Sequence, residues 1–179
     1  MLEPTQHDLG KYTMNNSNSA DRLSNPVALE LSKLVEQTGF RVYRSTAVKA
    51  VLKAGQPFTG IVRPKGYRQM GLKQCFWNAG RLALDGRGIY VEGFVLTPGS
   101  WSIPHAWLTL DGIHAIDVTL MDAPAYHYLG IAFSPKVLYE WMIRRRCTSL
   151  LPWDDDEQTS AVLEYARLQP PSFHDSEPQ

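Results

Sequence analysis

Cysteine is scarce in this chain, which has two, and charge of neither sign is in excess. Two thiols in a domain of ordinary size do not make a disulfide scaffold, so Cys75 and Cys147 are expected to be reduced. The 18 basic residues balance the 18 acidic ones, and a surface of that kind does not favour nucleic acid or anionic lipid. We therefore expect no nucleic-acid partner.

Long apolar runs and paired metal ligands are also missing. No segment approaches the roughly 18 consecutive apolar residues that a membrane span needs, and the first residues lack the basic-then-apolar order of a signal peptide. The five histidines and two cysteines show no paired spacing of the kind that holds zinc. The sequence predicts a cytoplasmic protein with no membrane contact, no metal and no other cofactor.

What is present fits one globular domain between two polar ends. With 179 residues, 44% of them hydrophobic and 20% charged, the chain is long enough to bury a core. Residues 1–24 are rich in Asn and Ser with few apolar anchors, and residues 169–179 hold three prolines. Both segments are expected to be disordered tails. The domain is predicted to span residues 25–168.

Helix signals occur near both ends of this domain. Asn25-Pro26 provides an N-cap and a first-turn proline before an apolar stripe. A short helix is expected over 47–53, and another from Pro135 to the arginines 144–146, whose charges complement the helix dipole. The acidic residues 154–157 are expected to cap a further helix rather than to bind a metal.

Strand signals fill the middle of the domain. A short strand is expected over 40–43, and a long surface loop over 55–71, because that segment carries four glycines and two prolines. Four strands follow in a predicted antiparallel meander, at 89–96, 104–110, 113–119 and 128–133. The predicted fold class is therefore α+β.

Cys75 is the candidate nucleophile. Gly71 precedes a helical pattern over 76–84, which places Cys75 in the first turn of the helix. The thiolate is the attacking form of cysteine, and a helix N-terminus beside a histidine favours it. A lone buried cysteine is more often an inert core residue. The catalytic interpretation therefore depends on His105 and Asp117, which follow in that order.

An Asp-Gly pair joins the predicted strands that carry His105 and Asp117, and it is a strong hairpin signal. With a two-residue turn the two side chains would point to opposite faces of the sheet. A three-residue loop ending at Gly112, with positive φ there, instead pairs Thr109 with Ile113 and puts His105 opposite Asp117. We expect the second register, because it also gathers the apolar side chains of both strands on one face.

Four short motifs, taken in order, resemble those of the transglutaminase-like superfamily of papain-fold enzymes. They are Gln74-Cys75-Phe76-Trp77, Gly93-Phe94, His105-Ala106-Trp107 and Asp117-Val118-Thr119, within residues 69–133. Val118 stands where the family usually has proline. The resemblance implies a papain/transglutaminase-like core, with the catalytic cysteine at the N-terminus of a helix packed on an antiparallel β-sheet. The chain has no room for the extra domains of the calcium-dependent members, so calcium dependence is not implied.

The resemblance also implies roles for the site residues. Cys75 would be the nucleophile, His105 its base, and Asp117 the group that orients the imidazole and stabilises its cation. The oxyanion would be met by the backbone N–H of Cys75 and a second donor, for which Gln69 and Gln74 are the candidates. The substrate would be a protein or peptide amide, and the thioester formed from it would react with water, a lysine or a small amine.

Two further residues have alternative interpretations. Trp107 either lines the site or is a core aromatic. Glu92 is either a substrate-facing carboxylate or a solvated strand position, and we favour the second. His114 and His127 are expected to be structural or surface residues.

The alternative to an enzyme is a catalytically silent papain-fold module that binds a polypeptide partner. A silent module has no physical need to keep a cysteine, a histidine and an aspartate together, so the intact set favours the enzyme. The sequence leaves the oligomeric state and the acyl acceptor open.

Overall fold

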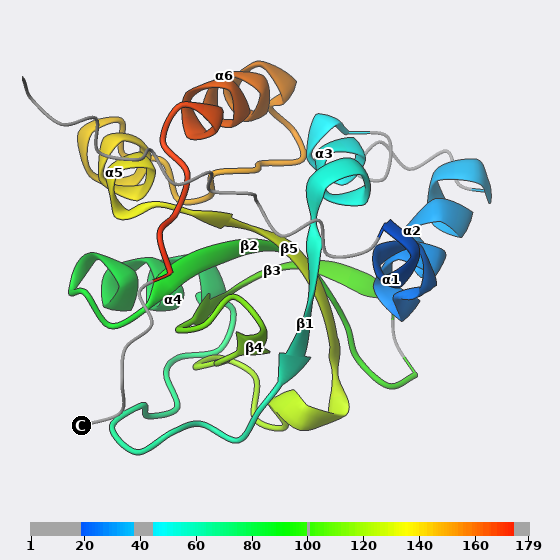
Figure 1. Cartoon of the computed structure of the whole chain (residues 1–179), viewed down its shortest axis with the longest axis horizontal. Helices are drawn as coiled ribbons and strands as arrows, with labels where there is room; N and C mark the ends of the chain where they lie inside the picture. The colour runs from blue at the N-terminus through cyan, green and yellow to red at the C-terminus, as the bar shows by residue number, and fades with distance from the viewer. Residues whose placement is uncertain (1–18, 38–44, 100, 174–179) are drawn as a thin grey trace, which may run out of the picture.

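The computed structural model describes residues 19–37, 45–99 and 101–173 (Figure 1). Within these ranges the chain is an α+β fold in which helices pack around one five-stranded sheet. The predicted strand at 40–43 lies outside the described residues, as do residues 1–18 and 174–179 of the predicted tails.

Two helices open the described chain. Helix α1 (Ser19–Ser24) falls inside the range predicted as a tail, and α2 (Pro26–Gln37) follows it after Asn25. Asn25 caps α2 as predicted, because its Oδ1 accepts a hydrogen bond of 2.9 Å from the backbone N–H of Val27. Despite its polar sequence, α1 packs against α2 and β1.

Helix α3 (Thr46–Ala54) confirms the short helix predicted from the sequence. The hydroxyl of Ser45 accepts a hydrogen bond of 3.4 Å from the N–H of Val48 and caps the helix. Its buried residues, Ala47, Val48 and Val51, belong to the larger of the two apolar clusters in the described chain.

Strand β1 (Gln56–Gly60) lies inside the segment predicted as a surface loop. Pro57 is placed opposite Leu129 in an antiparallel pair, so the proline did not prevent strand formation. At Gly60 an added Cβ would come within 1.9 Å of the backbone carbonyl oxygen of Ala123. Gly60 therefore permits a close approach of two backbones, whereas the sequence prediction interpreted this glycine as a sign of a loop.

The sheet has the order β3-β2-β5-β1-β4 and is mixed, which corrects the predicted antiparallel meander. Strand β5 inserts between β2 and β1, and β1 pairs with β4 in parallel. The remaining strands are β2 (Ile89–Leu96), β3 (Ser102–Thr109), β4 (His114–Ala115) and β5 (His127–Phe133). The strand predicted over 113–119 is therefore reduced to two residues.

The two edges of the sheet meet. Leu108 of β3 and Ile116, just after β4, exchange two backbone hydrogen bonds of 3.1 and 2.8 Å. The sheet therefore curls until its first and last strands touch, and Figure 1 shows β4 beside β3. This closure brings the segment after β4, which includes Asp117, onto the face of β3 that carries His105.

The sheet separates two apolar clusters. The helix-side core combines residues of the helices with one face of the strands, for example Val48, Ala79, Tyr90, Leu108 and Val162. The sheet-side core is smaller, and its buried members come from strands and the 3-10 helix η2 (Ala123–Ala125). Its buried members are Phe58, Val91, Val95, Trp107, Ala115, Ala123 and Tyr128.

The later helices follow the sequence prediction closely. Helix α5 (Pro135–Leu138) continues as the π-helix η3 (Tyr139–Arg144), and α6 (Asp156–Arg167) follows. Helix α4 (Cys75–Leu84) contacts β2 and β3, and its buried residues share the helix-side core with those of α3, α5 and α6.

Side chains cap these helices as expected. Asp155 accepts a hydrogen bond of 2.8 Å from the N–H of Gln158, which confirms that the acidic run caps α6. Arg144, the last residue of η3, and Arg145, which follows it, both pair with Glu140. Residues 169–173 continue beyond α6 without helix or strand.

Candidate active site

Cys75 is the first residue of α4, as predicted, and its side chain is buried with 9% of the residue exposed. The chain reaches it through Lys73, a non-glycine residue with φ of 62°. Gln74, the N-cap residue, makes no capping hydrogen bond with its side chain within the described chain. The N–H groups of the first helical turn are therefore left for other partners around the sulfur.

His105 lies on β3 and is 2% exposed. Its Nε2 is 2.7 Å from Oδ2 of Asp117, which confirms the expected contact, and Gly112 has the expected positive φ of 76°. The predicted register, which pairs Thr109 with Ile113, was wrong by two residues, because Leu108 pairs with Ile116 in the structure. A shift of two keeps every side chain on its predicted face, so the histidine and the aspartate still meet.

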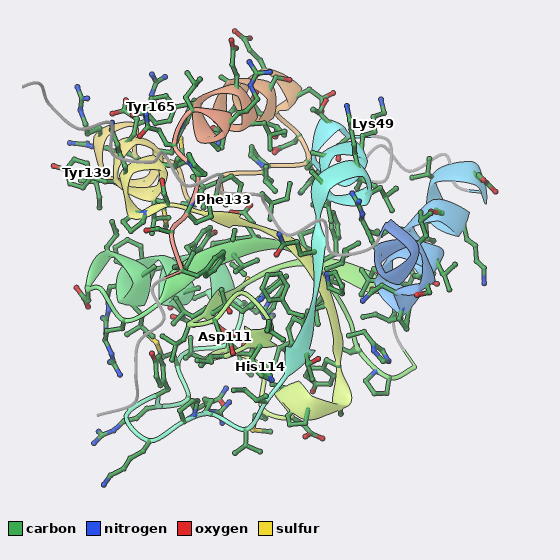
Figure 2. All side chains as sticks on the ribbon, in the orientation of Figure 1. Lys49, Asp111, His114, Phe133, Tyr139 and Tyr165 are labelled. Carbon is green, nitrogen blue, oxygen red and sulfur yellow. The ribbon has the colours of Figure 1, made fainter. Side chains whose placement is uncertain are left out.

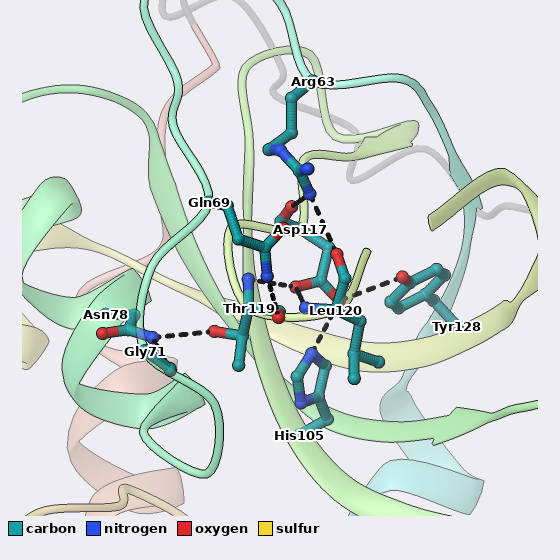
Figure 3. A network of polar contacts seen from close by, with 9 residues as sticks. All are labelled: Arg63, Gln69, Gly71, Asn78, His105, Asp117, Thr119, Leu120 and Tyr128. Atoms are coloured by element: carbon teal, nitrogen blue, oxygen red, sulfur yellow. Dashed lines mark hydrogen bonds and ion pairs between the residues drawn. The ribbon is translucent and has the colours of Figure 1, made fainter. Parts of the chain in front are cut away.

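The Asp117 carboxylate is fully buried and accepts four hydrogen bonds (Figure 3). Oδ2 accepts from His105 and, at 3.0 Å, from the hydroxyl of Tyr128. Oδ1 accepts from the backbone N–H groups of Thr119 and Leu120, both at 2.8 Å. These four donors occupy the acceptor positions that an ionised carboxylate offers, so the group is held in one orientation.

Two side chains brace the turn that carries this carboxylate. Nη1 of Arg63 donates to the backbone carbonyl oxygens of Asp117, at 3.2 Å, and of Leu120, at 2.9 Å. The side-chain amide of Gln69 donates to the carbonyl oxygen of Thr119. Gln69, predicted as an oxyanion donor, thus uses an N–H to hold the turn (Figure 3).

Asn78 ties the cysteine helix to the same turn. Its amide donates to the hydroxyl of Thr119 at 3.0 Å and to the carbonyl oxygen of Gly71 at 2.7 Å. Asn78 lies one turn after Cys75 on α4 and is buried. The bond therefore fixes the start of α4 and the loop before it relative to the aspartate turn.

The ionisation of the pair follows from these contacts. Burial alone would lower the pKa of His105, but hydrogen bonds and charge from Asp117 and Cys75 outweigh it and raise this pKa from 6.5 to about 9. Burial alone would raise the pKa of Asp117, but the His105 hydrogen bond and charge, with the two backbone N–H groups, hold it below its usual range. An imidazolium beside a carboxylate is the favoured state at neutral pH.

Glu92 is neither of the alternatives expected from the sequence. It is 2% exposed and lies on the helix-side face, between Tyr90 and Phe94 along β2. Its carboxylate accepts hydrogen bonds from the hydroxyls of Tyr90 and Ser149 and from the N–H groups of residues 150 and 151, at 2.8 Å each. The solvated-position interpretation was wrong, because this carboxylate ties the segment before α6 to the sheet.

Trp107 is fully buried in the sheet-side core. Its ring stacks beside the His105 imidazole, with 6.3 Å between centroids, and packs edge-on against Phe58 and Tyr128. This is the placement of a core aromatic that supports His105. Gln74, the other oxyanion candidate, is exposed at the start of α4, with its side chain against Gly71.

Tyr128, Arg63 and Thr119 complete the site and were not singled out from the sequence. The alternation of β5 alone places Tyr128 on an inward face, but nothing local indicates that its hydroxyl reaches a carboxylate. Arg63 lay in the segment interpreted as a loop. Thr119 belonged to the Asp-Val-Thr motif without an assigned role, which the structure gives through its contacts with Asn78 and Asp117.

His114, expected to be structural or at the surface, lies half-exposed against Asp111 (Figure 2). Its Nδ1 is 2.6 Å from the Asp111 carboxylate, which also accepts from two backbone N–H groups of the turn. His127, at the start of β5, is exposed. In the described ranges no group of three His, Cys, Asp or Glu side chains is arranged to hold a metal ion, and both cysteines are free.

A pocket of about 430 Å³ lies on the outer side of the aspartate turn. Arg63 and Gln69, which brace the turn, line it together with apolar residues such as Ile61 and Met121. Cys75 and His105 are not part of its lining.

Comparisons with protein-family models, curated proteins and solved structures gave no match to this chain. In the described ranges, no helix combines the length and the apolar character needed to cross a membrane. The candidate site therefore stands on its own geometry, in which a helix-start cysteine, a buried histidine and a buried aspartate are brought together.

Proposed function

We propose that this protein performs cysteine-dependent acyl transfer or hydrolysis at protein amide groups, as a transglutaminase-like enzyme with a papain-like core. One observation carries the proposal. The buried 2.7 Å contact between His105 and Asp117 lies beside a cysteine at the start of a helix, and that cysteine shifts the ionisation of the histidine. A cysteine paired with a histidine that a carboxylate orients is the arrangement of a nucleophilic site.

In the proposed reaction the proton of Cys75 has moved to His105 before the attack, which gives a thiolate and an imidazolium. Nε2 of His105 is bonded to Asp117, so Nδ1 is the ring nitrogen that holds this proton. The thiolate attacks the amide carbonyl carbon, and N–H groups at the start of α4 stabilise the oxyanion. His105 returns the proton to the departing nitrogen, and ammonia or an amine leaves a thioester on Cys75. Water or an amine then attacks this thioester, with His105 again as the base.

The proposed setting follows the chemistry of the site. The substrate is a glutamine-type or main-chain amide of a protein or peptide, and the residues of the site supply the reaction without a cofactor. Two free thiols fit a reducing compartment, so we propose a cytoplasmic location.

The test compares the two cysteines with a thiol alkylating probe across pH. Cys147 is the built-in control, because it is more exposed than Cys75, while burial raises its pKa. Peptide mass mapping is expected to show labelling of Cys75 well before Cys147. His105→Ala is expected to slow labelling at Cys75 alone, and equal slow labelling of both thiols would contradict the proposal.

A substrate screen extends this test. Wild type and Cys75→Ser are added to a cell lysate, and mass spectrometry seeks deamidated, crosslinked or cleaved peptides that appear only with the wild type. Cys75→Ala and His105→Ala are expected to abolish the same products while leaving the fold intact. Products that persist with Cys75→Ala would rule out the thioester.

The second candidate is a catalytically silent papain-fold module that binds a polypeptide. The observation in its favour is burial, since all three candidate residues are at least nine-tenths buried and the 430 Å³ pocket does not reach them. In that case Cys75 labels slowly at every pH, and binding to a captured polypeptide is unchanged by Cys75→Ser.

A further inference from the structure

Tyr128 and His105 share one oxygen of the Asp117 carboxylate. The tyrosine hydroxyl donates to Oδ2 at 3.0 Å, and His105 Nε2 lies 2.7 Å from the same atom (Figure 3). All three residues are buried to 2% exposure or less, so solvent does not compete for these bonds. The strength of the hydrogen bond from Tyr128 therefore affects the strength of the hydrogen bond from His105.

The ring of Tyr128 is held where this bond requires it. It lies on β5, with its centroid 5.0 Å from Trp107 and 6.5 Å from His105. Gly60 on β1 faces it, and a Cβ there would approach Cε2 of the tyrosine to 2.9 Å. Aromatic packing on one side and the backbone of Gly60 on the other thus fix the position of the hydroxyl.

Tyr128 can act only as a donor in this position. Burial, followed by the charge and hydrogen bond of Asp117, raises the pKa of Tyr128 far above its usual value. Tyr126 raises it further, and the positive charge of Arg63 lowers it slightly. The hydroxyl therefore keeps its proton around neutral pH and donates it to Asp117.

We propose that Tyr128 is a positioning residue that fixes the Asp117 carboxylate and limits how strongly this carboxylate holds the proton on His105. The inference rests on the proposed function for its catalytic meaning. The physical reason is that a donor to Oδ2 disperses negative charge, which reduces the attraction between the carboxylate and the imidazolium. The groups that face His105 electrostatically are Asp117 and Cys75.

The first experiment measures the titration of His105 by nuclear magnetic resonance in wild type and in Tyr128→Phe. Loss of the hydroxyl is expected to raise the pKa of His105 by roughly 0.5 to 1 unit. Tyr90→Phe is the matched control, because Tyr90 is equally buried and its hydroxyl bonds to Glu92 instead. The control is expected to leave the His105 titration unchanged.

The second experiment strengthens the donor without removing it, and it keeps the test valid if Tyr128→Phe does not fold. A 3-fluorotyrosine placed at position 128 has a more acidic hydroxyl and is expected to lower the pKa of His105. If Tyr128 had only a structural role, both variants would change the melting temperature but leave the pKa of His105 unchanged. An unmoved or oppositely shifted His105 would overturn the proposal.

Neither titration needs a substrate. If Cys75 proves unreactive while His105 shifts as expected, the proposed function fails and the positioning role of Tyr128 stands. If Cys75 is reactive and His105 does not shift, the reverse holds.

Discussion

Glu92 and Asp117 are buried carboxylates with nearly the same donors and opposite pKa shifts. Each accepts one tyrosine hydroxyl and two backbone N–H groups. The fourth donor is the Ser149 hydroxyl for Glu92 and the His105 imidazole for Asp117. Burial raises the pKa of Glu92 despite its hydrogen bonds, whereas His105 and the backbone N–H groups overcome burial and lower the pKa of Asp117.

The difference teaches that the charge of one donor, rather than the number of donors, decides the direction in which the pKa of a buried carboxylate shifts here. Neutral donors hold Glu92 in place and make it a tie between β2 and the segment before α6. A donor that can become a cation instead lowers the pKa of Asp117. The two faces of one sheet thus carry a structural carboxylate and a candidate catalytic one.

The largest expected effect is a difference in activity between variants of the two carboxylates. Asp117→Asn is expected to lower kcat/KM about 10³- to 10⁴-fold, because an amide holds the wrong tautomer of the imidazole. Glu92→Gln is expected to stay within about threefold of wild type, because it lies outside the site. The measurement is turnover of a peptide from the lysate screen, and similar losses in both variants would contradict the division.

The next effect concerns stability, for which Glu92 is expected to matter. Glu92→Ala leaves two hydroxyls and two backbone N–H groups without their acceptor, so the free energy of unfolding is expected to fall by about 3 kcal/mol. Urea unfolding measures it, and Glu92→Gln, which keeps the side-chain volume, is the control. A loss below about 1 kcal/mol would show that Glu92 does not hold the segment.

A third effect concerns pH. The pKa of His105 is raised from 6.5 to about 9 on folding, so its contribution to stability is complete below about 6.5 and is lost as pH rises through about 9. The free energy of unfolding is expected to fall across this window by an amount on the order of 3 kcal/mol at most. Urea unfolding from pH 6 to 10 tests this, and the same slope in His105→Ala would show that another group is responsible.

The smallest expected effect belongs to Gln69. Its amide braces the Thr119 carbonyl, so Gln69→Ala is expected to lower the free energy of unfolding by about 1 kcal/mol and kcat/KM by less than tenfold. An oxyanion donor would cost about 10²- to 10³-fold instead. Urea unfolding and turnover of the same peptide measure the two quantities, and a loss in the larger range would restore the oxyanion role.

Local signals predicted the elements whose residues decide their own conformation. The proline after Asn25, the acidic cap of α6 and the strand over 89–96 each depend on neighbours a few residues away, and all three were confirmed. The meeting of His105 and Asp117 was also predictable, because the faces of a hairpin depend only on whether the register is odd or even.

Non-local contacts decided the rest. The segment around Gly60 was interpreted as a loop, because the sequence does not say that another backbone approaches there. Glu92 was interpreted as solvated, because its four donors include three from residues more than fifty positions away. Nothing in the sequence near Tyr128 indicated that its hydroxyl would bond to the Asp117 carboxylate.

The sequence by itself determined the place of Cys75 at a helix start and the shared face of the histidine and the aspartate. Both are consequences of helix and strand periodicity, which act over a few residues. Only the tertiary structure decided the strand order, the closure between Leu108 and Ile116, and the four donors around Asp117. These depend on which distant segments pack together, and the free energy of that packing belongs to the whole fold rather than to any one stretch of chain.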